Sequence, residues 1–195
     1  EPYLDVLDLM VKGGLKSGRI LIFGDFERQA IFDEGHGRQR LAARIPYLPS
    51  HRLTMNCRNL PRIGYSVNIF SGLTPGYQKF RRTDDGVNPV WLKYERGNDQ
   101  SPQLREAVQE LRDDGFDLSE IVVLSPLGQN SVAATTSDPW LKGILEPADG
   151  SLPKKGRLRY STIHAFKGLD APAVAVTDLD RELVPNFASI LYVGL

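Results

Sequence analysis

The sequence lacks the features of a secreted protein, a membrane protein or a wholly basic protein. Its 195 residues include only one cysteine, Cys57, so no intramolecular disulfide can form, and we expect a reducing, cytoplasmic location. No run of about eighteen apolar residues occurs, which predicts no membrane span and no membrane partner. Lys and Arg together number 24, as do Asp and Glu, so a net charge of zero leaves room only for a local basic groove.

Two further absences concern the start of the chain and phosphate binding. The sequence begins EPYLDVLDLM, without an initiator Met and without the basic-then-apolar pattern of a secretory signal. It ends SILYVGL, inside an apolar segment, and we interpret it as part of a longer protein. No G-x-x-x-x-G-K-[ST] occurs, so the chain has no Walker A loop to hold phosphates.

The apolar residues that are present follow two periods. Positions with helical spacing predict helices over about 4–11, 61–70 and 104–111, and from about Phe187. Short apolar runs predict buried strands at 20–23 and 121–126, and strand-like segments predict further strands at 90–94, 158–163 and 173–179. Strands that alternate with helices predict an α/β protein with a parallel sheet covered on both faces.

Prolines mark the segments that we expect to be irregular. Pro46 and Pro49 interrupt the segment IPYLPSHRL, which is our candidate hinge between two domains. A second stretch, 127–156, is predicted to be irregular because it contains Pro139, Pro147 and Pro153.

Two segments place polar residues near the predicted hinge. LIFGDFERQAIF (21–32) is predicted to begin with a buried strand that ends in Gly-Asp at the carboxyl edge of a parallel sheet, where ligands bind. Gln29 in this segment can orient water or contact a phosphate. In LTMNCRN (53–59), Arg58 carries a planar fork of donors that can reach a phosphate across a cleft. Taken alone, each segment is better explained as a solvated turn or an ordinary surface arginine.

The third segment, RYSTIHAFKGLDAPAVAV (159–176), contains more residues with reactive or ligand-binding side chains than the first two. One loop at a sheet edge holds a hydroxyl, an imidazole, an ammonium, a glycine and a carboxylate, from Thr162, His164, Lys167, Gly168 and Asp170. Gly168 permits a positive φ or a close approach of the backbone, while Lys167 and His164 can meet phosphates. This density favours a functional loop over a structural one.

A fourth segment, ILYVGL (190–195), is by itself only an apolar helix. In this order, however, the four segments resemble motifs III to VI of the UvrD/Rep-type superfamily 1 helicases: GD…QAIF resembles motif III, NCR motif IV, STIHAFKGLD motif V and LYVGL the start of motif VI. The resemblance covers nearly the whole chain, and its motif V part is the most specific. It implies a RecA-like, P-loop NTPase-like fold, with 1–45 as the tail of a first RecA-like domain and 46–195 as the second, ending within motif VI.

The resemblance also implies a nucleotide site. Gln29 and Arg58 match the motif III glutamine and the motif IV arginine that detect the γ-phosphate of ATP. Gly168 and Asp170 match the Gly-x-Glu that lies against the nucleotide, with the acid reaching its ribose. ATP and Mg²⁺ are the implied cofactors, with most of their ligands upstream of this chain, and no metal site is expected within it.

Single-stranded nucleic acid, with DNA favoured, is the implied partner. Phe32 falls where the family has an aromatic residue that faces the strand, and stacking on such a ring tolerates any sequence. Thr162 and His164 match motif V positions close to the strand, and we group Lys167 with them because its ammonium can contact phosphates. The other implied partner is the first RecA-like domain of the same polypeptide.

The sequence departs from the family pattern at several positions. Asp25 and Gln29 are separated by three residues, where the family has two, and Glu34 stands where many relatives have a DNA-stacking Trp. Cys57 replaces the Tyr that packs on adenine, and the side chain of Asp170 is shorter than that of the family's Glu. The acidic DExx motif and the motif VI arginine are absent. We therefore expect an ATP-dependent helicase as the intact protein, and no ATP hydrolysis by this chain alone.

Two alternatives remain open at this stage. The departures at Cys57 and Glu34 suit a catalytically inactive, helicase-like module that docks nucleic acid or protein. An unrelated α/β enzyme with His164 and Asp170 as catalytic residues is the second, and it requires a closed pocket around these two side chains.

Overall fold

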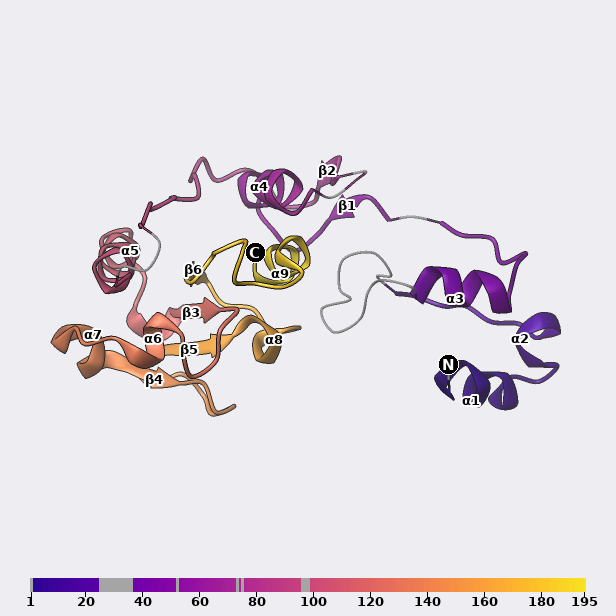
Figure 1. The fold of residues 1–195 in the computed structure, drawn as a ribbon. Helices are drawn as coiled ribbons and strands as arrows, with labels where there is room; N and C mark the ends of the chain where they lie inside the picture. Colours follow the sequence, from indigo (N-terminus) through magenta and orange to yellow (C-terminus); the bar gives the residue numbers. More distant parts are fainter. Residues whose placement is uncertain (1, 25–36, 52, 73, 75, 96–98) are drawn as a thin grey trace.

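The computed structural model describes residues 2–24, 37–51, 53–72, 74, 76–95 and 99–195. The helices and strands, in chain order, are α1 (Pro2–Met10), α2 (Gly14–Ser17), α3 (Gly37–Arg44), β1 (Met55–Asn56), α4 (Pro61–Ser71), β2 (Lys79–Phe80), α5 (Ser101–Asp113), the 3₁₀ helix η1 (Leu118–Glu120), β3 (Ile121–Ser125), α6 (Val132–Thr135), α7 (Pro139–Ile144), β4 (Leu145–Pro147), β5 (Leu158–Thr162), α8 (Ile163–Phe166), β6 (Ala173–Val176) and α9 (Phe187–Gly194). The strand–helix alternation predicts the class correctly: the protein is α/β (Figure 1).

A four-stranded parallel sheet in the order β4-β5-β3-β6 forms the centre of the fold. All five residues of β3 are buried, as the continuous apolar run IVVL predicts for a strand covered on both faces. Because side chains alternate along a strand, Ile121 and Val123 belong to one hydrophobic cluster and Val122 and Leu124 to another.

Helices cover the two faces of this sheet. On one face, α5 packs through Leu104 and Val108, together with residues of α6 and α7. On the other, residues of α8 and α9 join the second cluster. Helix α5 begins at Ser101, one residue earlier than the sequence suggests for a Ser101 cap followed by Pro102, and Gly115 follows its end with a φ of 101°.

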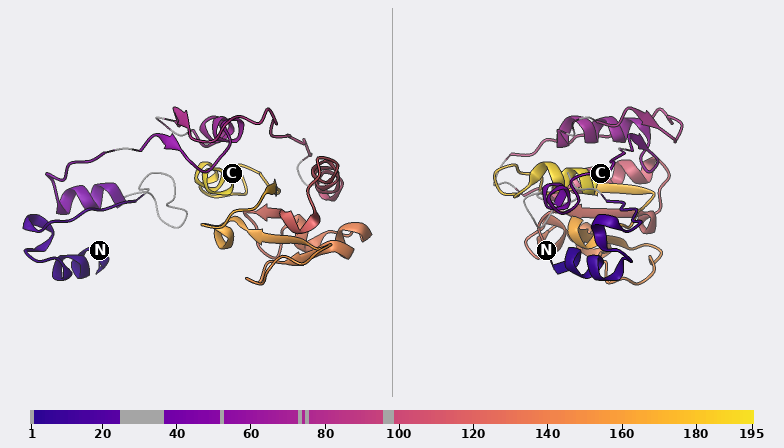
Figure 2. Two further views of the ribbon diagram at one scale, coloured as in Figure 1. Left: turned by 180° about the vertical axis from the view of Figure 1, so that it is seen from behind. Right: turned by 90° about the vertical axis from the view of Figure 1, so that its right-hand side faces the viewer.

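A second layer lies outside α9. Helix α4 packs against α9, and a two-stranded parallel sheet, β1–β2, lies beside them (Figures 1 and 2). The ring of Phe80 in β2 lies directly on Gly64 of α4, where an added Cβ would come within 2.1 Å of the ring. Gly64 therefore lets β2 pack close to α4.

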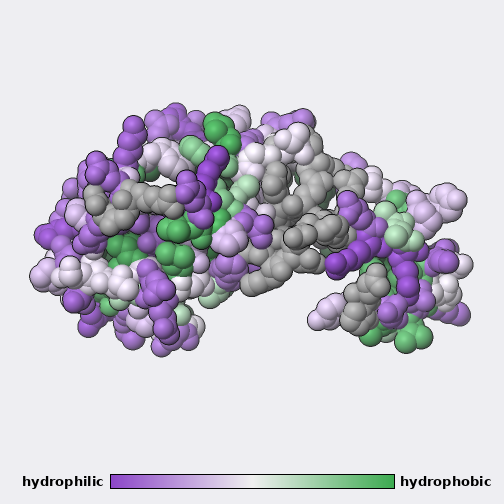
Figure 3. All heavy atoms as spheres, in the orientation of Figure 1, coloured by the Kyte–Doolittle hydropathy of each residue, from purple (hydrophilic) through white to green (hydrophobic). Residues whose placement is uncertain are grey.

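The segment that carries α1, α2 and α3 lies to one side of the sheet and its helices (Figures 1 and 2). Among its described residues only Leu15 and Ile45 are buried hydrophobic side chains, and Figure 3 shows hydrophobic surface exposed on this part. None of the helices in the described ranges has the length and apolar character needed to cross a membrane.

Three sequence predictions of local structure are wrong. Ile20–Phe23 is not a strand: Leu21 and Phe23 are each 79% exposed, and no described strand lies beside them to complete their main-chain hydrogen bonds. Residues 90–94 do not form a strand either; Trp91 packs on Phe70 of α4, with ring centroids 4.3 Å apart. The stretch 127–156 is not irregular throughout, since it forms α6, α7 and β4.

Candidate functional site

The carboxyl ends of the parallel strands define one edge of the sheet. Ser125 ends β3 and lies opposite Thr162, which ends β5, while Leu124 lies opposite Val176 at the end of β6. Ligands of open α/β proteins bind outside such an edge. Two segments meet there: the predicted loop 162–170 and the segment 177–180, which the sequence reasoning did not single out.

Thr162 begins α8 as well as ending β5. Its hydroxyl oxygen accepts a hydrogen bond from the main-chain N–H of Ala165 at 3.0 Å, so the side chain caps the helix. Helix α8 is anchored by Ile163 and Phe166, which are buried in the core, and this leaves His164 half-buried at the surface. Thr162 therefore has a structural role, and the nucleic-acid role predicted for it stays a prediction.

A tight turn follows α8. Gly168 has a φ of 88°, one of the two roles that the sequence left open for this glycine, and the N–H of Leu169 donates to the carbonyl of Phe166 at 3.0 Å. Lys167 and Asp170 are exposed on either side of this turn. The turn therefore presents a cation, a flexible backbone position and a carboxylate to solvent, at the edge of the sheet.

Arg58 is presented by a loop that Asn56 shapes. Asn56 is buried, and its side-chain oxygen accepts hydrogen bonds from the main-chain N–H groups of Arg58 and Asn59, both at 2.9 Å. Its side-chain amide donates to the side-chain oxygen of Asn59 at 3.0 Å. This side-chain-to-backbone turn fixes the direction in which the chain leaves β1.

Arg58 reaches the turn after α8. Its guanidinium donates a hydrogen bond from Nη2 to the carbonyl oxygen of Leu169 at 2.7 Å, across 111 positions of sequence. The structure thus brings the segment around Arg58 together with the segment that contains Gly168 and Asp170. Gln29 and Phe32 lie outside the described residues, so their place relative to this site stays a prediction.

Sequence reasoning missed a buried carboxylate at the same edge. Asp178 is 7% exposed, and its oxygens accept hydrogen bonds from the hydroxyls of Ser125 (2.6 Å) and Thr177 (2.9 Å) and from the N–H of Val132 (3.3 Å). The N–H of Asp178 donates to the side-chain oxygen of Gln100 at 3.1 Å. Asp178 therefore links the ends of β3 and β6 to the starts of α5 and α6. The polar pair Thr-Asp directly after the apolar run AVAV was the available signal.

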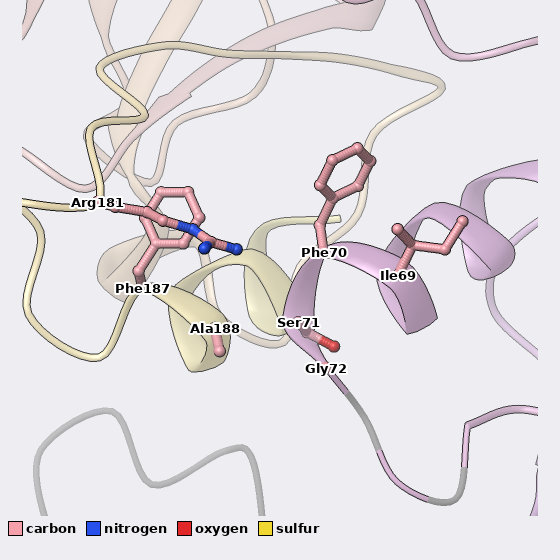
Figure 4. A pocket seen from close by; sticks show the side chains of 7 residues that line it. All are labelled: Ile69, Phe70, Ser71, Gly72, Arg181, Phe187 and Ala188. Atoms are coloured by element: carbon pink, nitrogen blue, oxygen red, sulfur yellow. The ribbon is translucent and has the colours of Figure 1, made fainter.

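A pocket of about 370 Å³ lies elsewhere, where the end of α4 meets the start of α9 (Figure 4). Phe70 and Phe187 contribute rings to it, and the guanidinium of Arg181 lies 5.5 Å from the centroid of the Phe187 ring. None of the predicted site residues lines this pocket. Asp170 is exposed and His164 half-buried, which does not match the closed pocket that an enzyme built on these two residues requires.

Within the ranges that the structure describes, no three His, Cys, Asp or Glu side chains come together as ligands for a metal ion. The fold and this edge define the class of the protein: an α/β protein whose parallel sheet is flanked by helices, with polar loops at the carboxyl ends of its strands. Comparison of the chain with protein-family models, with curated proteins and with solved structures finds no match.

Proposed function

We propose that this chain is part of a superfamily 1 helicase motor that hydrolyses ATP as the intact protein. Residues 46–195 are its second RecA-like domain, and residues 1–45 the tail of the first. Support comes from the parallel sheet with helices on both faces, and from the order of the four motif-like segments along the chain.

The contact between Arg58 and Leu169 carries the proposal. A motor of this class needs its motif IV arginine and its motif V loop at one nucleotide site, and these segments are 111 positions apart in the sequence. A guanidinium that donates to a main-chain carbonyl keeps further N–H donors for a phosphate. The 2.7 Å hydrogen bond thus supports a shared site at which Arg58 binds the γ-phosphate.

In this proposal ATP lies between the two domains. Gln29 detects the γ-phosphate from the first domain, while Gly168 and Asp170 lie against the nucleotide from the second. Bound Mg²⁺ would neutralise phosphate charge, and its ligands belong to the Walker motifs that this sequence does not contain. The residues of this chain bind and orient the nucleotide, and we predict that the chain alone releases no phosphate from ATP.

Single-stranded DNA is the second ligand of the proposal, contacted by His164 and Lys167, by the main chain near Thr162, and by Phe32 from the first domain. Lys167 supports this role because it is exposed at the same edge of the sheet. Since the hydroxyl of Thr162 caps α8, its contribution is to hold the helix that presents His164.

Proton–nitrogen correlation spectra of the 195-residue chain test the proposal. Titration with ATP at millimolar concentration is expected to shift the amide signals of residues 57–59 and 167–170, and Arg58→Ala to remove this response. A short oligo(dT) is expected to shift the signals of residues 162–167. Phosphate release from ATP is measured in parallel, and none is expected.

The possible outcomes separate the proposal from its alternative. If neither ATP nor oligo(dT) shifts any signal at these segments, the motor function is wrong. Binding of oligo(dT) without any response to ATP favours the inactive docking module. Turnover of ATP by the chain that Arg58→Ala abolishes would contradict the expectation that the chain needs the rest of the motor.

A further inference from the structure

A second arginine lies at the loop that carries Arg58. Nη1 of Arg82 donates a hydrogen bond to the main-chain carbonyl of Arg58 at 3.2 Å. The parallel pairing of β1 with β2 fixes this neighbourhood, because Asn56 lies opposite Phe80 and the N–H of Arg81 donates to the carbonyl of Asn56 at 2.9 Å. The guanidinium of Arg82 therefore lies against the main chain of Arg58, on a segment whose position the β1–β2 pairing fixes.

The two guanidinium groups are not neutralised by the described part of the chain. Arg58 and Arg82 are both exposed and donate to carbonyl oxygens, and neither forms an ion pair with a described carboxylate. Arg62, by contrast, pairs with Asp84 at 3.0 Å. There the N–H of Gly86, and then Arg62, hold the pKa of the Asp84 carboxyl below its usual range.

An anion that binds both guanidinium groups supplies the counter-charge that the described part of the chain does not provide. Each guanidinium has five N–H donors, so one hydrogen bond to a carbonyl leaves a fork free for phosphate oxygens. Because the whole chain has a formal net charge of zero, this pair is a local feature and not part of a general basic surface. A chain of linked phosphates can bridge two such forks from the same loop.

We propose that Arg82 is a second phosphate-binding residue of this site, and that Arg58 and Arg82 together bind adjacent phosphate groups of a nucleoside polyphosphate. The inference rests on the proposed function, because it takes the Arg58 site as the nucleotide site. It adds a residue from β2 and the segment after it, which the motif-like segments do not include.

Sodium tripolyphosphate is the probe, titrated at constant ionic strength into the 195-residue chain and followed by the amide signals of residues 57–59, 81–82 and 168–170. Arg58→Ala and Arg82→Ala are each expected to weaken binding roughly three- to tenfold, the effect of losing one charge-assisted contact at an exposed site. Arg157→Ala is the matched control, because Arg157 is also exposed and donates to a main-chain carbonyl, that of Gly143, at 2.7 Å. It is expected to leave binding unchanged.

Arg82→Gln separates binding from structure. The glutamine side chain is shorter by two bonds and carries no charge, so our proposal predicts the same loss as for Arg82→Ala. Unchanged amide signals of residues 57–59 in the variant without ligand would show that the loss is not a structural effect. Wild-type affinity for tripolyphosphate in Arg82→Gln, with weakened binding in Arg58→Ala, overturns the role of Arg82 and leaves the proposed function standing.

Two further outcomes overturn the inference in different ways. If Arg82→Gln weakens binding of oligo(dT) but not of tripolyphosphate or ATP, Arg82 serves the nucleic acid and not the nucleotide. If the wild-type chain responds to neither tripolyphosphate nor ATP, the nucleotide site itself is wrong, and the proposed function fails with it.

Discussion

Two regions of the molecule use apolar residues differently. In the sheet region, residues 99–195, the run Ile121–Leu124 is buried from end to end because β5 and β6 flank it and helices cover both faces. In the amino-terminal region, residues 2–24, 37–51, 53 and 54, the comparable run Ile20–Phe23 forms no strand and has Leu21 and Phe23 exposed. The two runs have similar sequences, but only Ile121–Leu124 has described strands on both sides.

The comparison teaches that a short apolar run becomes a strand only when neighbouring strands complete its hydrogen bonds. A single extended segment cannot satisfy its own main-chain groups. We therefore expect the cooperative stability of this chain to belong to the sheet region, and each prediction below pairs a change in that region with a counterpart in the amino-terminal region.

The largest difference is expected for core truncation. Leu158 of β5 is 0% exposed, so Leu158→Ala removes buried methyl groups and leaves a cavity, and should lower the free energy of unfolding by about 2–5 kcal/mol. Leu21→Ala, at a side chain 79% exposed, should change it by less than about 0.5 kcal/mol. Urea denaturation followed by circular dichroism measures both.

Leu158→Val provides a milder truncation if the alanine variant does not fold. It should fall between the wild type and Leu158→Ala. Equal losses for Leu158→Ala and Leu21→Ala would mean that the two regions unfold as one unit, and the distinction between them would be wrong.

The second effect concerns the buried carboxylate of Asp178. Asp178→Ala removes the acceptor for Ser125, Thr177 and Val132 and should cost about 2–4 kcal/mol of unfolding free energy. The amino-terminal counterpart is Asp8, whose side chain accepts from the N–H of Leu15 at 2.7 Å. Asp8→Ala should leave the main unfolding transition unchanged.

Asp178→Gly tests the physical reason for this cost. Asp178 has a φ of 59°, a conformation that glycine adopts without strain, so the glycine variant removes the hydrogen bonds but also the backbone strain. It should be more stable than Asp178→Ala and less stable than the wild type. Wild-type stability in Asp178→Gly would show that the hydrogen bonds contribute no more than the backbone strain costs.

Much of the sheet region can be predicted from the sequence because its signals are local. The apolar face of α5 predicts the helix, and the runs at β3, β5 and β6 predict strands, of which only β3 is buried along its whole length. The errors at 20–23 and 90–94 have one cause. An apolar or β-branched run carries no information on whether a neighbouring strand exists to pair with it.

Some features of the candidate site also follow from local sequence, while others depend on tertiary contacts. Local sequence predicts the positive φ of Gly168 and the polar loop after β5, because both depend on adjacent residues. The contacts of Arg58 with Leu169 and of Arg82 with Arg58 depend on tertiary structure, as does the network of Asp178 with Gln100. Spacing along the chain does not reveal such contacts.

A smaller effect is expected from backbone strain. An alanine Cβ at Gly168 meets no atom within 4 Å, so Gly168→Ala costs only the strain of a φ near 88°, about 1–2 kcal/mol. Gly13 has a similar φ of 89° in the amino-terminal region, and Gly13→Ala should not lower the main transition. Thermal unfolding measures both. Equal losses in the two variants would contradict the separation of the regions.

The smallest effect depends on pH. The N–H of Leu141 donates to Asp138 and, with Arg105, lowers the pKa of this carboxyl, so its charged form is favoured in the folded protein. This contribution to stability is present above the unfolded pKa of about 3.9 and is lost as the pH falls through the lower folded value. Asp138→Asn keeps an oxygen acceptor for Leu141, so it should be slightly less stable than the wild type at neutral pH and equal to it in strong acid. Glu106→Gln is the control for the change in net charge. The amino-terminal counterpart is Asp5→Asn, which breaks the ion pair with Arg44 and should leave the main unfolding transition unchanged at every pH. A gap between wild type and Asp138→Asn that persists unchanged into strong acid would assign the effect to packing instead of to charge.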